Sequence, residues 1–155
     1  MFNVIDYWEG NNIALGKVVR DVLIGRQYTY AKHILPHDGK NTNSHDGVSD
    51  EDFLKGLGLE IEVEERTKDL ERDTINIRSI LHRCRFDEDK AKGLLAALRN
   101  HRQEKDEKTG LWNFKHDWTS HGVSAFRGFA VGYNQHMVVN TSQIMGKSRP
   151  SIARM

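Results

Sequence analysis

The sequence predicts an α/β domain in which a β-sheet is covered by helices. Three segments rich in strand-forming residues alternate with two helical segments, and further helical segments follow them. The chain has 155 residues, of which 37% are hydrophobic and 29% are charged. This length suits one domain with a hydrophobic core. We assign residues 1–138 to the domain and expect residues 139–155, which are polar and rich in chain breakers, to form a loose tail.

The three predicted strands lie in the first half of the chain, at residues 2–8, 27–35 and 59–65. The first is rich in β-forming residues, the second ends at a proline, and the third alternates strictly between apolar and polar residues. Between them, apolar residues at helical spacing predict a helix over 11–25. A capping box from Ser49 to Asp52 predicts a short helix over 49–58.

The second half of the chain is predicted to be helical. One apolar stripe at helical spacing consists of Ile77, Ile80, Leu81 and Cys84, and a second consists of Ala91, Leu94, Leu95 and Leu98. A charged segment over 99–110 follows and ends in a turn at Gly110. The last helix is indicated by Val123, Phe126, Ala130 and Tyr133.

The overall charge excludes a strong global attraction to nucleic acid, because 23 basic and 22 acidic residues leave a net charge of +1. The single cysteine excludes an internal disulfide. No apolar run approaches the roughly 20 residues that span a bilayer, and the N-terminus has no secretory pattern. We therefore expect a cytoplasmic protein without a membrane partner.

A histidine and an aspartate, His37 and Asp38, follow the second predicted strand. In open α/β sheets, ligand groups gather beyond the carboxyl ends of strands, where a carboxylate can bind Mg²⁺ or Mn²⁺. Asp-Gly is also a common turn pair, and its aspartate often bonds its own backbone. The spacing alone favours the turn.

The other candidate residues lie in or beside the stretch HDWTSHGVSAFRGFA, which begins at His116. His116 and His121 are five residues apart, just off the i, i+4 spacing that puts two metal ligands on one helical face. Surface histidines are the alternative. Lys115 belongs to a basic segment that contains aromatic residues, a mixture that suits contacts to DNA and also a solvated helix end.

Five motifs occur along the chain in the order VIDYWEGNN, LPHDG, INIRSIL, CRFDEDKAKGLLAALRNHRQEKDEKTG and HDWTSHGVSAFR. Together they resemble the C-terminal nuclease domain of the large terminase subunit of tailed bacteriophages. The resemblance runs from about Val4 to about Gly132. Its most specific parts are PHD and HDWxSH…AFR, with the aspartate-rich helix between them.

The resemblance implies a ribonuclease H-like fold, with a mixed sheet flanked by helices, and an endonuclease that cuts concatemeric viral double-stranded DNA. Aspartates of that family hold two Mg²⁺ or Mn²⁺ ions about 4 Å apart. Asp38 matches the family's aspartate after its fourth strand. Ser124 stands where the family's last helix carries an acid, and the family's first aspartate lies on a strand that would precede Phe2.

The resemblance also suggests roles for neighbouring residues. Asp117 is the carboxylate that could substitute in the metal site beside Ser124. The polar neighbours would be His37, His116 and His121, and the DNA contacts would be Lys115 and Arg127. The three predicted strands would be the family's third, fourth and fifth, so the first two strands of its sheet would be missing. We then expect the segment 2–8 either to pair with 27–35 or to depend on a partner chain.

Three interpretations follow. The first is a terminase nuclease-like domain that is weak or inactive alone, in the cytoplasm of an infected or lysogenic bacterial host. The second is a non-catalytic fragment that binds DNA or another terminase or portal component and is completed by a partner, as a homodimer or a split protein. The third is an unrelated α/β domain, which a large separation between Asp38 and the last helix would favour.

Overall fold

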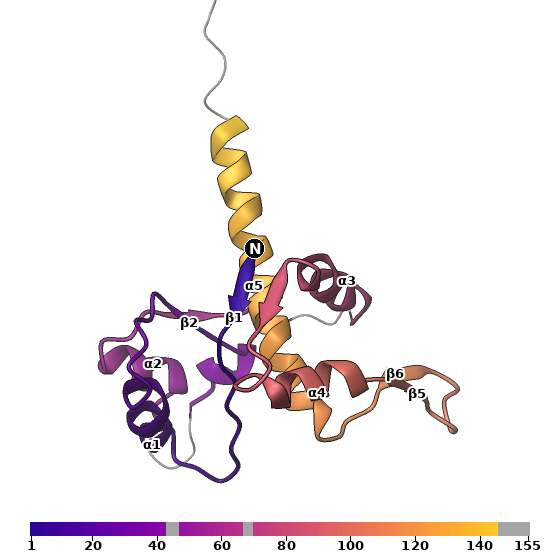
Figure 1. Cartoon of the computed structure of the whole chain (residues 1–155), viewed down its shortest axis with the longest axis horizontal. Coiled ribbons are helices and arrows are strands. Elements are labelled where there is room, and N and C mark those ends of the chain that lie inside the picture. Colours follow the sequence, from indigo (N-terminus) through magenta and orange to yellow (C-terminus); the bar gives the residue numbers. More distant parts are fainter. Residues whose placement is uncertain (43–46, 67–69, 146–155) are drawn as a thin grey trace, which may run out of the picture.

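The computed structural model describes residues 1–42, 47–66 and 70–145, and these form a mixed α/β fold (Figure 1). Its strands are β1 Phe2–Val4, β2 His33–Leu35, β3 Ile61–Val63, β4 Cys84–Phe86, β5 Gln103–Lys105 and β6 Trp112–Phe114. Its α-helices are α1 Leu15–Val18, α2 Asp50–Gly56, α3 Leu70–Leu81, α4 Lys92–Asn100 and α5 Thr119–Met145. A π-helical segment, Val19–Ile24, continues α1, and a 3₁₀ turn, His37–Lys40, follows β2.

The strands form three separate pairs. β1 pairs with β4 and β2 pairs with β3, both in parallel, while β5 and β6 form an antiparallel hairpin. The expectation that the first predicted strand pairs with the second is therefore wrong. Within the described ranges, β1 and β2 each have a strand on one edge alone.

The partner strand of β1 begins at Cys84, which the apolar spacing assigns to a helix. Cys84 continues the helical spacing of the α3 stripe, but α3 ends at Leu81 and Cys84 begins β4. Cys84 and Phe86 are half-buried while Arg85 is exposed, which is the two-residue period of a strand. The parallel register sets Phe2 opposite Cys84, so pairing with a distant segment overrides the local helical pattern.

The helix over 49–58 begins as predicted. Ser49 Oγ accepts a hydrogen bond from the Asp52 backbone N–H at 3.0 Å and donates one to Asp52 Oδ2 at 2.7 Å. Gly58 follows α2 with φ +81°, a conformation that favours glycine. The helix predicted over 11–25 is present as α1 and its π-helical continuation. Its N-cap is Ala14, which makes no side-chain capping hydrogen bond.

The charged segment over 99–110 contains the end of α4 and supplies the first strand and the turn of a hairpin that the sequence did not predict. All three β5 residues are exposed, so the strand has no apolar alternation to mark it. The predicted turn at Gly110 is confirmed: its φ is +72°, and the Asp106 carboxylate accepts hydrogen bonds from the Lys108 and Thr109 N–H groups.

The helix α5 carries the core. Its Phe126 and Ala130 are buried together with Ile80 of α3 and Leu94 of α4. Two strand pairs and two helices thus gather around α5 (Figure 1). Residues 139–145 of the predicted tail belong to this helix, and 146–155 lie outside the described residues. Across the described ranges, no helix is long and apolar enough to cross a membrane.

Glycines allow α4 and α5 to approach closely. A Cβ at Gly122 would lie 3.0 Å from Ala97 Cβ and 3.0 Å from Tyr7 Oη. A Cβ at Gly93 would lie 3.0 Å from two atoms of the same tyrosine ring. Tyr7, three residues after β1, therefore fills the space between the two helices.

Candidate functional site

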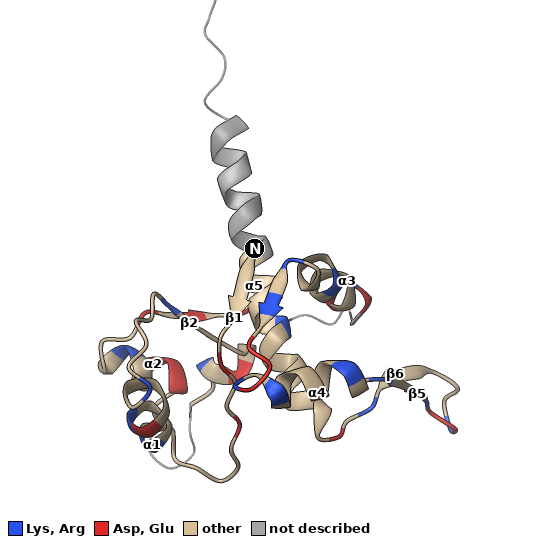
Figure 2. Ribbon diagram, in the orientation of Figure 1, with Lys and Arg blue, Asp and Glu red and all other residues tan. Residues whose placement is uncertain are grey.

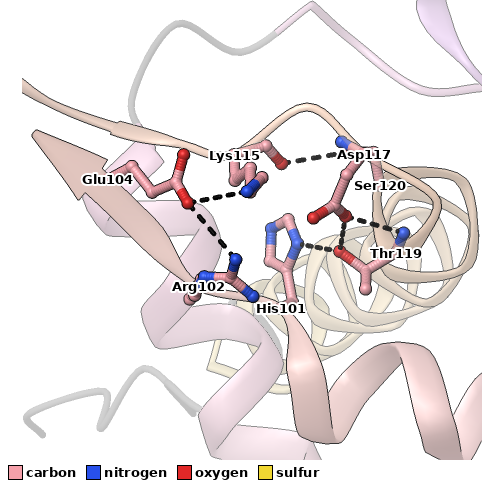
Figure 3. Close-up of polar contacts among 7 residues, drawn as sticks. All are labelled: His101, Arg102, Glu104, Lys115, Asp117, Thr119 and Ser120. Atoms are coloured by element: carbon pink, nitrogen blue, oxygen red, sulfur yellow. Dashed lines mark hydrogen bonds and ion pairs between the residues drawn. The ribbon is translucent and has the colours of Figure 1, made fainter. Parts of the chain in front are cut away.

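The first turn of α5 is fixed by a polar network (Figure 3). Asp117 Oδ1 accepts hydrogen bonds from the Thr119 backbone N–H at 2.9 Å and from Thr119 Oγ1 at 2.7 Å. The Asp117 N–H donates to Ser120 Oγ at 3.0 Å, and Ser120 Oγ donates to the Lys115 carbonyl. The hydrogen bonds from Thr119 hold the pKa of Asp117 below its usual range. Asp117 therefore serves to start the helix.

The network extends to the end of α4 and the base of the hairpin. His101 Nδ1 lies 2.8 Å from Thr119 Oγ1, and the His101 ring stacks on Phe114 with 5.0 Å between ring centroids. Lys115 Nζ donates to Glu104 Oε1 at 2.8 Å, and Arg102 pairs with the same oxygen at 3.3 Å (Figure 3).

The order of these groups differs from a nucleophilic triad. In a catalytic triad a histidine lies between the hydroxyl and the carboxylate. Here the hydroxyl of Thr119 lies between His101 and Asp117. Thr119 is also buried, with 1% of its surface exposed, so no substrate reaches its oxygen. The arrangement fixes the helix start and the tautomer of His101.

A second polar cluster joins three elements through Arg127. Its Nη2 donates to Glu64 Oε1 at 2.9 Å, and its Nη1 donates to Asp73 Oδ2 at 3.1 Å. The Glu64 and Asp73 side chains are only 4% and 7% exposed. Arg127 of α5 thus ties the residue after β3 to α3, and its guanidinium is held within the fold by two carboxylates.

One face of α5 follows the strand pair β2–β3 towards its carboxyl end. A Cβ at Gly132 would lie 2.8 Å from Ile34 Cδ1, in the middle of β2. A Cβ at Gly128 would lie 3.5 Å from Glu64 Oε2, just beyond the end of β3. Ser124 is a further four residues back on the same face, about 6 Å along the helix axis. A Cβ at Gly128 would also lie 3.9 Å from Ile34 Cγ2, so both glycines face β2.

Asp38 also lies beyond the carboxyl end of β2, in the exposed 3₁₀ turn that packs against α2 and β3. Its backbone carbonyl accepts a hydrogen bond from the Asn41 N–H at 2.8 Å. The neighbouring Gly39 is buried, and a Cβ there would lie 3.1 Å from Leu35 Cβ. His37, in the same turn, is exposed as well.

The structure brings half of the predicted site residues together. Those that line one cavity of about 460 Å³ between α3 and α5 are Lys115, His116, Ser124 and Arg127. Asp38 and His37 are not among its lining residues. His121 is exposed, and its ring centroid lies 6.4 Å from that of His116.

The residues present do not fit a two-metal set. In the part of the chain that the structure describes, no three His, Cys, Asp or Glu side chains converge as a metal-binding group. The acids nearest the Arg127 end of the cavity, Glu64 and Asp73, already hold an arginine. Glu64 could have been noticed in the sequence, because it directly follows the alternating strand beside β2. The sequence gives no sign that His101 and Thr119 lie together, since they are 18 residues apart.

Protonation of His101 is expected to destabilise the fold. Burial lowers the pKa of His101, although the Asp117 charge acts in the opposite direction, and burial also lowers the pKa of His33. A lowered histidine pKa means that the folded state favours the neutral ring. Stability is therefore present above the ordinary pKa of about 6.5 and is lost as the pH falls towards the folded-state value.

Urea unfolding at a series of pH values between about 7 and 5 checks this expectation. His101→Asn keeps a side-chain N–H donor for Thr119 but cannot gain a proton, so its stability should fall less steeply with pH. His82→Asn, at an exposed position, is the matched control for the loss of one histidine. An unchanged slope in His101→Asn would contradict the assignment.

No protein-family model matches the chain, and neither the curated proteins nor the solved structures provide a match.

Proposed function

We propose that the chain is a phage terminase nuclease-like domain that retains the scaffold of a two-metal DNA endonuclease but cuts DNA weakly or not at all by itself. Its place would be the cytoplasm of an infected or lysogenic bacterium. Its partners would be double-stranded DNA and other terminase or portal components. The proposal joins the motif resemblance to the arrangement of α5 and β2–β3.

The observation that carries the proposal is the α5 face made by Ser124, Gly128 and Gly132. Gly128 and Gly132 of this face lie against Ile34 of β2 and Glu64 after β3, and Ser124 is one helical turn further towards the start of α5. The carboxyl end of a parallel pair is where α/β folds collect ligand groups. Asp38 follows β2 at that same end. The resemblance predicts two acids there, one after β2 and one on α5. Asp38 is the first of them, and α5 carries Ser124 in place of the second.

The serine explains the weak or absent activity. A serine hydroxyl is neutral, whereas Mg²⁺ and Mn²⁺ are hard cations that are held mainly by carboxylate oxygens. With Ser124 in place of the acid, Asp38 lacks a second carboxylate from α5. We therefore derive no cleavage step from the residues present.

Restoring the acid tests this proposal. The Ser124→Asp variant is expected to bind Mn²⁺ more tightly than the wild-type chain, measured by isothermal titration calorimetry. The Ser124→Asp/Asp38→Ala double variant should lose that gain. Ala125→Asp is the matched control, because residue 125 is also exposed on α5 but points about 100° away around the helix. Equal Mn²⁺ binding by Ser124→Asp and Ala125→Asp would contradict the proposal.

A cleavage assay completes the test. The wild-type chain, shown to be folded by circular dichroism, should nick supercoiled plasmid DNA in Mn²⁺ no faster than Asp38→Ala. Fast cleavage that Asp38→Ala abolishes would show instead that the chain has a working metal site, and the assignment of weak or absent activity would be wrong.

A second candidate is a non-catalytic fragment that a partner chain completes. The specific observation is that β1 and β2 belong to different two-stranded parallel sheets, and each has an edge that no described strand covers. Small parallel sheets are normally buried parts of larger ones, and open strand edges favour association. Double-stranded DNA binding without any Mn²⁺ gain in Ser124→Asp would favour this candidate over the first.

Strong binding to DNA by charge alone does not suit either candidate. Basic and acidic residues are interspersed along the described ribbon (Figure 2). The net charge of +1 gives little long-range attraction to phosphates. Of the predicted DNA contacts, Arg127 is held by Glu64 and Asp73, and Lys115 is paired with Glu104. Any DNA contact would have to be short-ranged.

A further inference from the structure

The cavity between α3 and α5 has an apolar interior. Its volume of about 460 Å³ falls in the range of small-molecule sites. The apolar side chains that line it come from α3, α4, β6 and α5, and they are Ile77, Leu81, Leu98, Phe114 and Val123. Phe114 is held in position by its stacking on His101. Such a lining suits a flat hydrocarbon or aromatic body.

The charged side chains of the lining are mostly cationic. Arg78, Lys115 and Arg127 line the cavity, and Asp73 is the acid among them. Lys115 and Arg127 already have carboxylate partners. Arg78 has no carboxylate partner among the residues that the structure describes. Its guanidinium can therefore receive an anionic group from a ligand, in the two-pronged geometry that carboxylates fit.

His101 adds a directed acceptor to the lining. Thr119 donates its one hydroxyl hydrogen to Asp117, so Thr119 Oγ1 accepts from the N–H at Nδ1 of His101. In the neutral ring the lone pair is then on Nε2. His101 lines the cavity, so Nε2 is the ring nitrogen that can accept a hydrogen bond from a ligand.

We infer that this cavity is a binding site for a small aromatic carboxylate, with the ring against the apolar lining and the carboxylate on Arg78. The inference goes beyond the proposed function and does not depend on metal binding. Its supports are the volume of the cavity, its apolar interior and the unpaired guanidinium at its wall. An uncharged ligand would leave Arg78 unused, and a cationic one would be repelled by Arg78.

The test compares two probes of the same shape, 2-naphthoate and 2-naphthamide, by ¹H–¹⁵N NMR titration of the full chain. The wild-type chain should bind the carboxylate more tightly, with the largest amide shifts near residues 77, 98 and 123. Arg78→Gln should weaken naphthoate binding by about tenfold or more, as expected when a charge-assisted hydrogen bond is lost. The same change should leave naphthamide binding nearly unaltered.

A second variant separates the cavity from the rest of the surface. Val123→Phe should fill part of the cavity and reduce the binding of both probes, while Trp112→Ala removes an exposed aromatic ring of the hairpin and should change neither. The amide spectrum of each variant shows whether it is folded, and Arg78→Gln alters an exposed residue. Equal affinity for the two probes, or shifts centred on the hairpin, would overturn the inference.

Discussion

Arg127→Met is expected to destabilise the protein by about 3 kcal/mol or more. The change leaves the Glu64 and Asp73 carboxylates buried and without their cation, and removing one partner of a buried ion pair typically costs about 3–5 kcal/mol. We place the value near the lower end because the arginine side chain is 23% exposed. Urea unfolding followed by circular dichroism measures the change.

Two further variants make this result specific. Arg127→Met combined with Glu64→Gln and Asp73→Asn removes the uncompensated charges and should recover a large part of the loss. Lys17→Met removes an exposed pair with Asp21 on adjacent helical turns and should have little effect on stability. If Arg127→Met cost no more than Lys17→Met, Arg127 would not be the link between β3, α3 and α5.

Phe126→Ala is expected to cost about 3–5 kcal/mol, the usual range for removing a buried phenylalanine. Phe126 is 4% exposed, and its ring centroid lies 6.0 Å from that of Phe86 and 5.8 Å from that of Phe129. It therefore attaches the β1–β4 pair to α5. Small domains have a total stability of only about 5–15 kcal/mol, so the variant should unfold at a much lower urea concentration.

Phe53→Ala is the control for Phe126→Ala. The same side chain is removed there from α2, at a position that is 39% exposed. We expect a much smaller loss of stability, because less apolar surface leaves water when Phe53 folds into place. Similar losses in the two variants would mean that α5 does not form the centre of the core.

The stability variants and the functional variants affect different parts of α5. Phe126 and Arg127 face the core and the buried carboxylates, while Ser124 and Ala125 are exposed. A change in Mn²⁺ binding in Ser124→Asp can therefore be separated from loss of the fold. The naphthoate experiment tests Arg78 on α3, in the cavity that Ser124 and Arg127 also line, so it is run on the otherwise wild-type chain.

Some elements could be predicted because their signals are local in the sequence. The capping box at Ser49 is set by residues that are three positions apart, and the turn at Gly110 needs a glycine for its positive φ. The last helix is marked by its apolar spacing, and Phe126 and Ala130 of that stripe are buried as expected. The mixed α/β character follows from the same local signals.

Only the tertiary structure decided the pairings between distant segments. Cys84 fits the helical stripe of α3 in the sequence, yet it forms a strand because Phe2 pairs with it across the fold. Likewise, the sequence around Arg127 predicts an exposed basic residue. The fold instead brings it to Glu64 and Asp73, which are 63 and 54 positions away along the chain. Such contacts depend on how helices and strands pack, and no periodicity within one segment records which distant residue will face it.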